Sequence, residues 1–143
     1  MRWFGSGDTV RLADIAQIPV IRGIVGTIED LRGDVVWSVE RLAALRAQVE
    51  AYGLTLDVIE SIPVHEAIKR GTRERDALID IYCESVRNLG RVGVRVLCYN
   101  FMPVFDWMRT DLAVRLADGS LVSSYDHQQM LAYDLAAGFE NRV

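Results

Sequence analysis

The chain has 143 residues and is 50% hydrophobic, which is enough for one domain with its own core. Its net charge of -4 and pI near 5.1 come without a basic cluster, so we expect neither nucleic acid nor an anionic membrane surface as a partner. No apolar run approaches the roughly 20 residues of a membrane-spanning helix, and the start MRWFGSGDTV lacks a signal-peptide core.

The first part of the chain predicts two strands and two helices. Residues 1–4 are expected to add a strand beside the next one, and VRLADIAQ predicts a short helix that must stop before Pro19. The apolar run GIVGTI predicts a strand at 23–28. A helix at 38–52 follows, because apolar residues recur there every three or four positions; Ser38 is suited to cap it and Gly53 to end it.

The middle of the chain repeats this order. LTLDVIES predicts a strand at 54–61, and VRVLCYNF predicts another at 94–101. A helix is predicted between them at 73–90, bounded by Thr72 and Gly90. Its apolar stripe has the spacing of one helix face: Leu78, Ile81, Tyr82, Val86 and Leu89.

Three apolar strands joined by helices predict a parallel sheet that is buried on both faces. Cys98 is then expected to face the core, and Cys83 lies within the helix; without metal-site spacing, the two are expected to be free thiols in a reducing cytoplasm. Right-handed βα units of this kind build either a doubly wound sheet or a barrel. No GxGxxG follows a strand and opens a helix, which favours an α/β fold of the barrel type over a dinucleotide-binding one.

The pattern changes after Trp107. Residues 114–124 predict a β-hairpin that turns at Asp118–Gly119, because Asp-Gly is a strong hairpin signal. A last helical stretch begins after Asp126, which can cap it. No linker or low-complexity segment divides the chain, so residues 1–143 are expected to form a single domain.

Polar side chains follow each predicted strand, and the carboxyl ends of parallel strands are where such folds bind ligands. The candidates for a polar small-molecule pocket are Arg2, Trp3, Thr27, Glu29, Asp30, Glu60, Ser61, His65, Glu66, Tyr99, Asn100, Asp106, Arg109 and Asp111. Each has a simpler interpretation: Glu60 and Glu66 as solvated charges, His65 as a loop residue, Asp106 and Arg109 as a local ion pair. Asn100 is the strongest candidate, because an amide at a buried strand end needs a partner.

Several blocks also resemble one family. RWFGSGDTV, IESIPVHEAIK and above all CYNFMPVFDWMRTDL are similar to mannonate dehydratase of hexuronate catabolism, in order and in spacing, over nearly the whole chain. The resemblance implies a (β/α)₈ TIM barrel that dehydrates D-mannonate to 2-keto-3-deoxygluconate with Mn²⁺, or with Fe²⁺, Co²⁺ or Mg²⁺. The cation is needed on the carboxylate oxygens when the weakly acidic neighbouring proton is removed, and a second group protonates the departing hydroxyl. With the strand-end argument, it implies substrate contacts at Trp3, Glu60, His65, Asn100, Asp106 and Arg109.

Two departures from the family pattern matter. The family usually has a His near the TIEDL stretch, where this chain has Glu29 and Asp30. Family members are also more than twice as long, and their metal ligands come from later strands. We therefore expect a partial barrel that binds no metal alone, leaves sheet edges open, and associates with itself or with a complementing carboxyl-terminal half.

Three functional interpretations follow. The first is the amino-terminal part of a mannonate dehydratase, as a fragment or as one partner of a split enzyme. The second is a non-catalytic relic that keeps a sugar-acid pocket and acts as a binding or assembly module. The third is an unrelated βα enzyme of the isomerase–epimerase barrel type.

Overall fold

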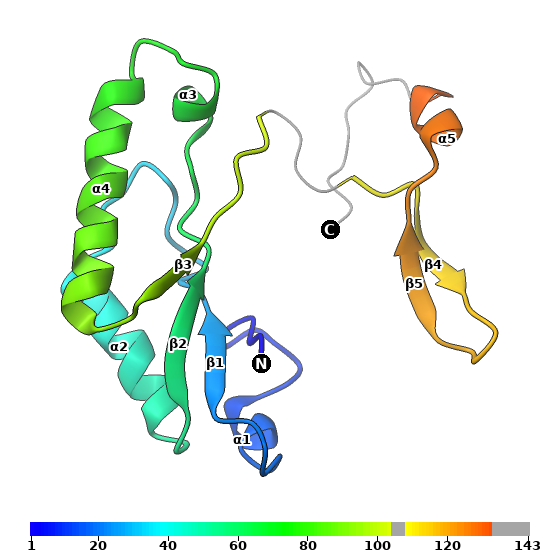
Figure 1. Ribbon diagram of the computed structural model, residues 1–143, viewed down its shortest axis with the longest axis horizontal. Coiled ribbons are helices and arrows are strands. Elements are labelled where there is room, and N and C mark those ends of the chain that lie inside the picture. The colour runs from blue at the N-terminus through cyan, green and yellow to red at the C-terminus, as the bar shows by residue number, and fades with distance from the viewer. Residues whose placement is uncertain (104–107, 133–143) are drawn as a thin grey trace. The chain divides into compact units, whose positions relative to one another are not determined.

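The computed structural model describes residues 1–103 and 108–132 (Figure 1). The chain divides into two compact units, Met1–Phe101 and Met102–Val143. In the described part of the chain, none of the helices combines the length and apolarity that crossing a membrane requires.

The first unit is built on a three-stranded sheet in the order β1 (Gly23–Gly26), β2 (Thr55–Glu60) and β3 (Val96–Cys98). Both neighbouring pairs are parallel, as the sequence predicted, although each strand is shorter than expected. The predicted amino-terminal strand is reduced to one parallel bridge between Arg2 and Val25, secured by two main-chain hydrogen bonds of 2.9 Å.

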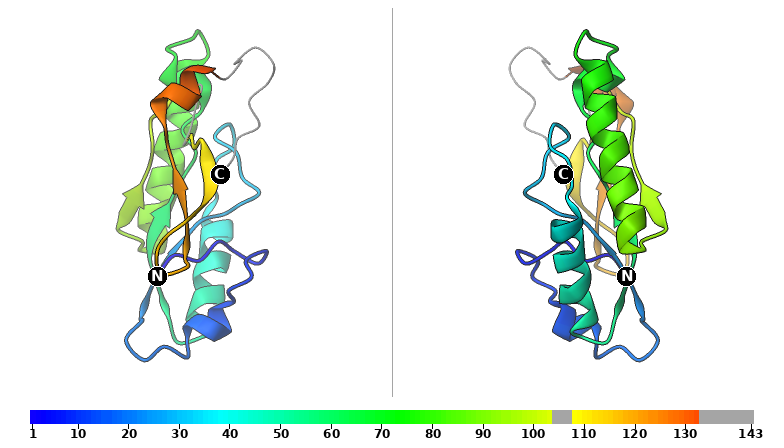
Figure 2. Two further views of the ribbon diagram at one scale, coloured as in Figure 1. Left: turned by 90° about the vertical axis from the view of Figure 1, so that its right-hand side faces the viewer. Right: turned by 90° about the vertical axis from the view of Figure 1, so that its left-hand side faces the viewer.

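Helices α2 (Val39–Glu50) and α4 (Arg75–Val92) connect the strands and lie on one face of the sheet (Figures 1 and 2). Ser38 caps α2 as predicted, accepting a hydrogen bond from the main-chain N–H of Arg41. Two short helices, α1 (Leu12–Ile15) and α3 (Glu66–Lys69), precede β1 and α4 respectively.

The predicted limits of α4 were wrong. The N-cap position is Glu74, and Thr72 instead donates its hydroxyl proton to the Glu74 carboxylate, 2.8 Å away. The helix continues through Gly90 and ends at Gly93, whose φ of 88° is the left-handed conformation that glycine adopts without strain. The N–H of Val94 donates to the carbonyl of Leu89, which completes the helix-ending motif.

The hydrophobic core lies between the sheet and the two long helices. It is formed by Trp3, Leu12, Ile15, Ile24, Ile28, Trp37, Leu42, Leu45, Val49, Leu54, Leu56, Ile59, Ile62, Leu89, Val92 and Val94. The prediction of a sheet buried on both faces was wrong for this unit, because β2 and β3 expose their other face, with Val96 48% exposed. Cys98 is exposed for the same reason rather than core-facing, and Cys83 is exposed on α4; both are free thiols.

The buried face of α4 also differs from the predicted stripe. Val86 is exposed, whereas Ser85 and Asn88 are almost fully buried and line the face with Leu78, Leu89 and Val92. Ser85 and Asn88 are tolerated on the buried face of α4 because both form hydrogen bonds with the loop between β1 and α2.

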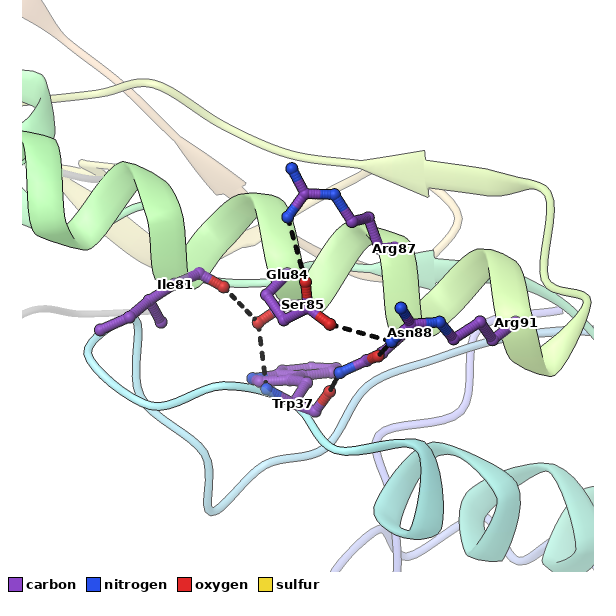
Figure 3. Close-up of polar contacts among 7 residues, drawn as sticks. All are labelled: Trp37, Ile81, Glu84, Ser85, Arg87, Asn88 and Arg91. Carbon is purple, nitrogen blue, oxygen red and sulfur yellow. Dashed lines mark hydrogen bonds and ion pairs between the residues drawn. The ribbon is translucent and has the colours of Figure 1, made fainter.

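That loop runs from β1 to α2 and ends at Trp37, whose ring is completely buried. The main-chain N–H of Trp37 donates to Ser85 Oγ at 3.0 Å, and its carbonyl accepts from Asn88 Nδ2 at 3.0 Å (Figure 3). Ser85 in turn donates to the carbonyl of Ile81 at 2.9 Å, and Asn88 Oδ1 accepts from Arg91 at 2.5 Å. We call this arrangement the Trp37 clamp; it satisfies two buried main-chain groups that belong to no helix or strand.

The second unit contains an antiparallel hairpin of β4 (Asp111–Arg115) and β5 (Leu121–Ser124). The predicted turn at Asp118–Gly119 is confirmed: Gly119 has a φ of 86°, and the hairpin extends slightly beyond the predicted 114–124. Helix α5 (His127–Ala132) follows, and Asp126 caps it by accepting from the N–H of Gln129 at 2.8 Å.

Removing either side chain of the Trp37 clamp should destabilise the first unit. Asn88→Ala or Ser85→Ala leaves a buried main-chain group of Trp37 without its partner, which costs about 1–3 kcal/mol. Arg87→Ala, on the exposed side of the same helix, is the matched control and should change the free energy of unfolding by less than about 0.5 kcal/mol. Urea titration followed by far-ultraviolet circular dichroism measures all three; a clamp variant as stable as the control would contradict the assigned role.

Candidate functional site

The carboxyl ends of the three parallel strands meet at one edge of the sheet, and polar groups gather there. Arg2 reaches this edge from the amino terminus: its guanidinium donates to the carbonyl of Glu60 and lies 3.9 Å from the Glu60 carboxylate. Thr27, just after β1, donates its hydroxyl proton to the carbonyl of Ser61 at 3.1 Å. Side-chain contacts thus connect the amino terminus to the end of β2, and the end of β1 to the residue that follows β2.

A pocket of about 390 Å³ opens beside the end of β1. It is enclosed by the amino-terminal segment, the residues that follow β1 and one face of α2, and its lining includes Trp3, Ser6, Thr27, Glu29, Asp30 and Arg41. Gly5 also contributes to the wall, with a φ of 89° that favours glycine. A β-carbon at Gly5 would lie 2.0 Å from Oε1 of Glu29, so the carboxylate of Glu29 lies directly against this glycine.

Asp30 and Arg41, which both line this pocket, form an ion pair with 2.5 Å between Arg41 Nη2 and Asp30 Oδ1. The hydrogen bond from Arg41 lowers the pKa of the Asp30 carboxyl below its ordinary value. Both side chains are exposed, Arg41 by 48% and Asp30 by 67%, so solvent screens the pair and it adds little to stability. The pair places an anionic and a cationic group side by side near the end of β1.

The structure places the predicted site residues in different surroundings. Trp3 is only 4% exposed and belongs to the core, although it also lines the pocket; its indole Nε1 has no hydrogen-bond partner among the described residues. Glu60 ends β2 at the sheet edge, in contact with Arg2. Asn100 is half-buried, two residues beyond β3.

His65 caps α3, with its Nδ1 accepting a hydrogen bond from the main-chain N–H of Ala67 at 3.1 Å. A neutral imidazole that accepts at Nδ1 carries its proton on Nε2, so this ring can donate one hydrogen bond to a ligand. The simpler interpretation of His65 as a loop residue and the functional one therefore fit the same geometry.

Arg109 belongs to the second unit. Its Nε donates to Ser123 Oγ at 3.2 Å and its Nη1 to the carbonyl of Met108 at 2.9 Å, so part of its fork is engaged within that unit. Asp106 lies outside the described residues.

Sequence reasoning missed Arg41 as a pocket residue. It lies on the first turn of α2, three residues after the cap Ser38, and that position next to the loop after β1 was a usable signal. Arg2 was recognised only as a residue near a strand end, because a contact with the carbonyl of a residue 58 positions away has no signature in the sequence.

Comparison with known proteins gives a consistent result. Residues 1–141 match the family model of D-mannonate dehydratase (UxuA). The chain is 54% identical to a mannonate dehydratase of Thermotoga neapolitana over 127 residues, and 50% identical to one of Lactococcus lactis subsp. lactis (strain IL1403) over 126 residues. These alignments cover 88% and 87% of this chain but 35% of each relative, so the chain spans about a third of the length of the curated relatives it matches.

A solved structure agrees with this. The crystal structure of mannonate dehydratase from Streptococcus suis serotype 2 superimposes with a TM-score of 0.90 at 46% identity, over 95% of this chain and 39% of that one. Identity and fold therefore both relate the chain to one portion of these longer proteins.

Replacing Arg41 should change the titration of Asp30. Without the hydrogen bond from Arg41, we expect Arg41→Met to raise the Asp30 pKa toward the ordinary value of about 3.9. Because the folded-state pKa is the lower one, the pair stabilises the fold above the unfolded pKa, and this contribution is lost as the pH falls through the folded pKa, below about pH 4.

Carboxyl-carbon NMR titration measures this change. Arg46→Met is the matched control, since Arg46 pairs with Glu50 at 2.7 Å on the same helix and should leave Asp30 unaffected. Equal Asp30 titrations in the two variants would refute the assigned contact.

Proposed function

Since this chain belongs to the D-mannonate dehydratase family, we propose that it supplies the amino-terminal part of a (β/α)₈ barrel that removes water from D-mannonate to give 2-keto-3-deoxygluconate. The observation that carries the proposal is the family match over residues 1–141, supported by the TM-score of 0.90 to a mannonate dehydratase. The active unit is then this chain together with the larger part of the family length that it does not span, as a cytoplasmic catabolic enzyme.

The proposed substrate wall is the sheet edge described above. D-mannonate carries hydroxyls along its chain and one carboxylate, so its pocket needs several fixed donors and acceptors and one cation. In the proposal, Asn100 and the Nε2–H of His65 form hydrogen bonds with substrate hydroxyls. Glu60 accepts a hydrogen bond from another substrate hydroxyl, while the Arg2 guanidinium donates to the main-chain carbonyl of Glu60. The roles that the sequence predicts for Arg109, which binds the substrate carboxylate, and for Asp106, which contacts the substrate, are kept in the proposal, and Trp3 closes one side.

The metal of the proposed enzyme is assigned to the rest of the barrel. In residues 1–103 and 108–132, no three His, Cys, Asp or Glu side chains lie together as a metal site requires. The residues described here do not fit the Mn²⁺ that the family resemblance implies, so we assign them substrate contacts and no step at the metal.

A chimera tests the proposed function. This chain would replace the matched portion of the Streptococcus suis mannonate dehydratase in one continuous polypeptide, with Mn²⁺ added, and 2-keto-3-deoxygluconate formation from D-mannonate would be measured. We expect turnover in the chimera and a loss of kcat/KM of about 10²-fold in Asn100→Ala with Arg109→Ala, because hydrogen bonds to charged groups contribute about 1.5–3 kcal/mol.

Arg115→Ala is the control, since Arg115 also belongs to the hairpin unit and donates to the carbonyl of Gly119 at 3.2 Å. It should leave kcat/KM within about twofold, as expected for a surface substitution. A folded chimera without turnover would refute the dehydratase activity and favour a non-catalytic binding module. Turnover that survives the double substitution would refute the residue roles.

A further inference from the structure

The loop between β1 and α2 comes closest to the residues before α3 at Gly33. A β-carbon placed on Gly33 would lie 2.6 Å from the carbonyl oxygen of Pro63 and 3.1 Å from the main-chain nitrogen of His65. The first distance is well inside the roughly 3.3–3.6 Å at which carbon and oxygen atoms pack. Both atoms belong to the main chain, so neither can turn aside as the end of a flexible side chain could. Gly33 does not have a positive φ, so glycine is needed here for space and not for backbone conformation.

A second contact joins the same two segments. The Thr27 hydroxyl, at the start of the loop, donates to the carbonyl of Ser61 at 3.1 Å. Between Ser61 and Pro63, the side chain of Ile62 is 2% exposed and belongs to the hydrophobic core. The residues that follow β2 are therefore anchored in the core at Ile62 and packed against the loop on either side of it. The position of His65 then depends on the path of that loop.

The ring of His65 is held as well as its main chain. Nδ1 accepts a hydrogen bond from the N–H of Ala67 at 3.1 Å, and Ala67 is only 9% exposed. Because the main chain is fixed at Gly33 and the ring at Ala67, the direction in which Nε2–H can donate is set too. This N–H is the group to which the proposed function assigns a substrate hydroxyl.

We propose that Gly33 is a positioning residue of the reaction: it admits the main chain of the loop against Pro63 and His65, and so sets the place from which His65 donates to the substrate. The inference rests on the proposed function, which supplies the substrate hydroxyl. The loop is also held at Thr27 and by the Trp37 clamp, so it cannot swing away from an added methyl group and the displacement reaches His65. Small displacements of a positioned group are costly in catalysis.

The first test needs no turnover. The chain has two histidines, so the ring nitrogen signals of the full 143-residue chain can be assigned by comparison with His65→Gln. At about pH 8, where imidazole is neutral, we expect ¹⁵N NMR to show His65 as one tautomer with its proton on Nε2. Gly33→Ala should move its two nitrogen signals toward each other, because a weaker bond to Ala67 lets the tautomers exchange. His127, whose Nδ1 lies 2.9 Å from the Tyr125 hydroxyl in the second unit, is the internal reference and should not shift.

Turnover tests the consequence. In the chimera with the Streptococcus suis mannonate dehydratase, Gly33→Ala should lower kcat/KM about tenfold, the effect of losing one hydrogen bond in the transition state. In a His65→Ala background the same substitution should cost less than about twofold, because the residue that it positions is gone. Gly7→Ala is the matched control: a β-carbon at Gly7 would meet no atom within 4 Å, so the His65 signals and kcat/KM should stay as in the parent.

Thr27→Val keeps the test decisive should Gly33→Ala fail to fold. It removes the hydroxyl that contacts Ser61 and should move the His65 ring signals in the same direction by a smaller amount. Two results would overturn the positioning role. One is an unchanged His65 signal in folded Gly33→Ala, or in Thr27→Val where Gly33→Ala does not fold. The other is an equal loss of kcat/KM from Gly33→Ala with and without His65.

Failure of the proposed function looks different. Shifted His65 signals in the chain, together with a folded chimera that makes no 2-keto-3-deoxygluconate, would refute the dehydratase activity and still support the placement of His65 by Gly33.

Discussion

The first unit depends on two buried side chains of α4 that hold both main-chain groups of Trp37. Ser85 accepts from the N–H and Asn88 donates to the carbonyl, each at 3.0 Å. The loop between β1 and α2 has no regular hydrogen-bond ladder at this point, so without these two side chains it would bury a donor and an acceptor that lack partners. The clamp therefore determines the path of the loop, and with it the position of the cap Ser38 and the start of α2 at Val39.

The position of that loop determines the pocket at the end of β1. Thr27, Glu29 and Asp30 lie at its start, and Arg41 lies at the beginning of the helix that it leads into. The exposed Asp30–Arg41 pair cannot hold these elements together by its own energy, because water screens it. The buried neutral hydrogen bonds at Trp37 fix the backbone, and the ion pair at the surface follows from that placement.

Much of the first unit could be predicted from the sequence, because its signals are local. Apolar runs located the three parallel strands, and Ser38 located the start of α2. The limits of α4 were wrong because Gly90 looks like a helix end, while the residue in the left-handed conformation is Gly93. Ser85 and Asn88 stand at the spacing of the buried stripe, and two polar residues at such positions were a readable sign of a buried hydrogen-bonded contact.

The candidate site was less predictable, because it depends on which distant segments meet. The parallel topology correctly brought Thr27, Glu60 and Asn100 to one edge, but Trp3 is mainly a core residue and Arg2 makes the direct contact with Glu60. Neither distinction follows from residue type. Arg109 belongs to the second unit, and Asp106 lies outside the described residues.

The sequence pattern and the observed burial disagree at β3, and the disagreement is informative. Val96, Cys98 and Phe101 have the composition of a core strand, yet all three are exposed in this unit. Hydrophobicity that an isolated unit leaves in water lowers its stability and promotes association, so it is expected only where another polypeptide segment covers it. Local pattern and global burial normally agree, and they diverge at functional surfaces. The same apolar residues that made the strand predictable thus form an apolar surface at β3 that the described residues leave exposed to water.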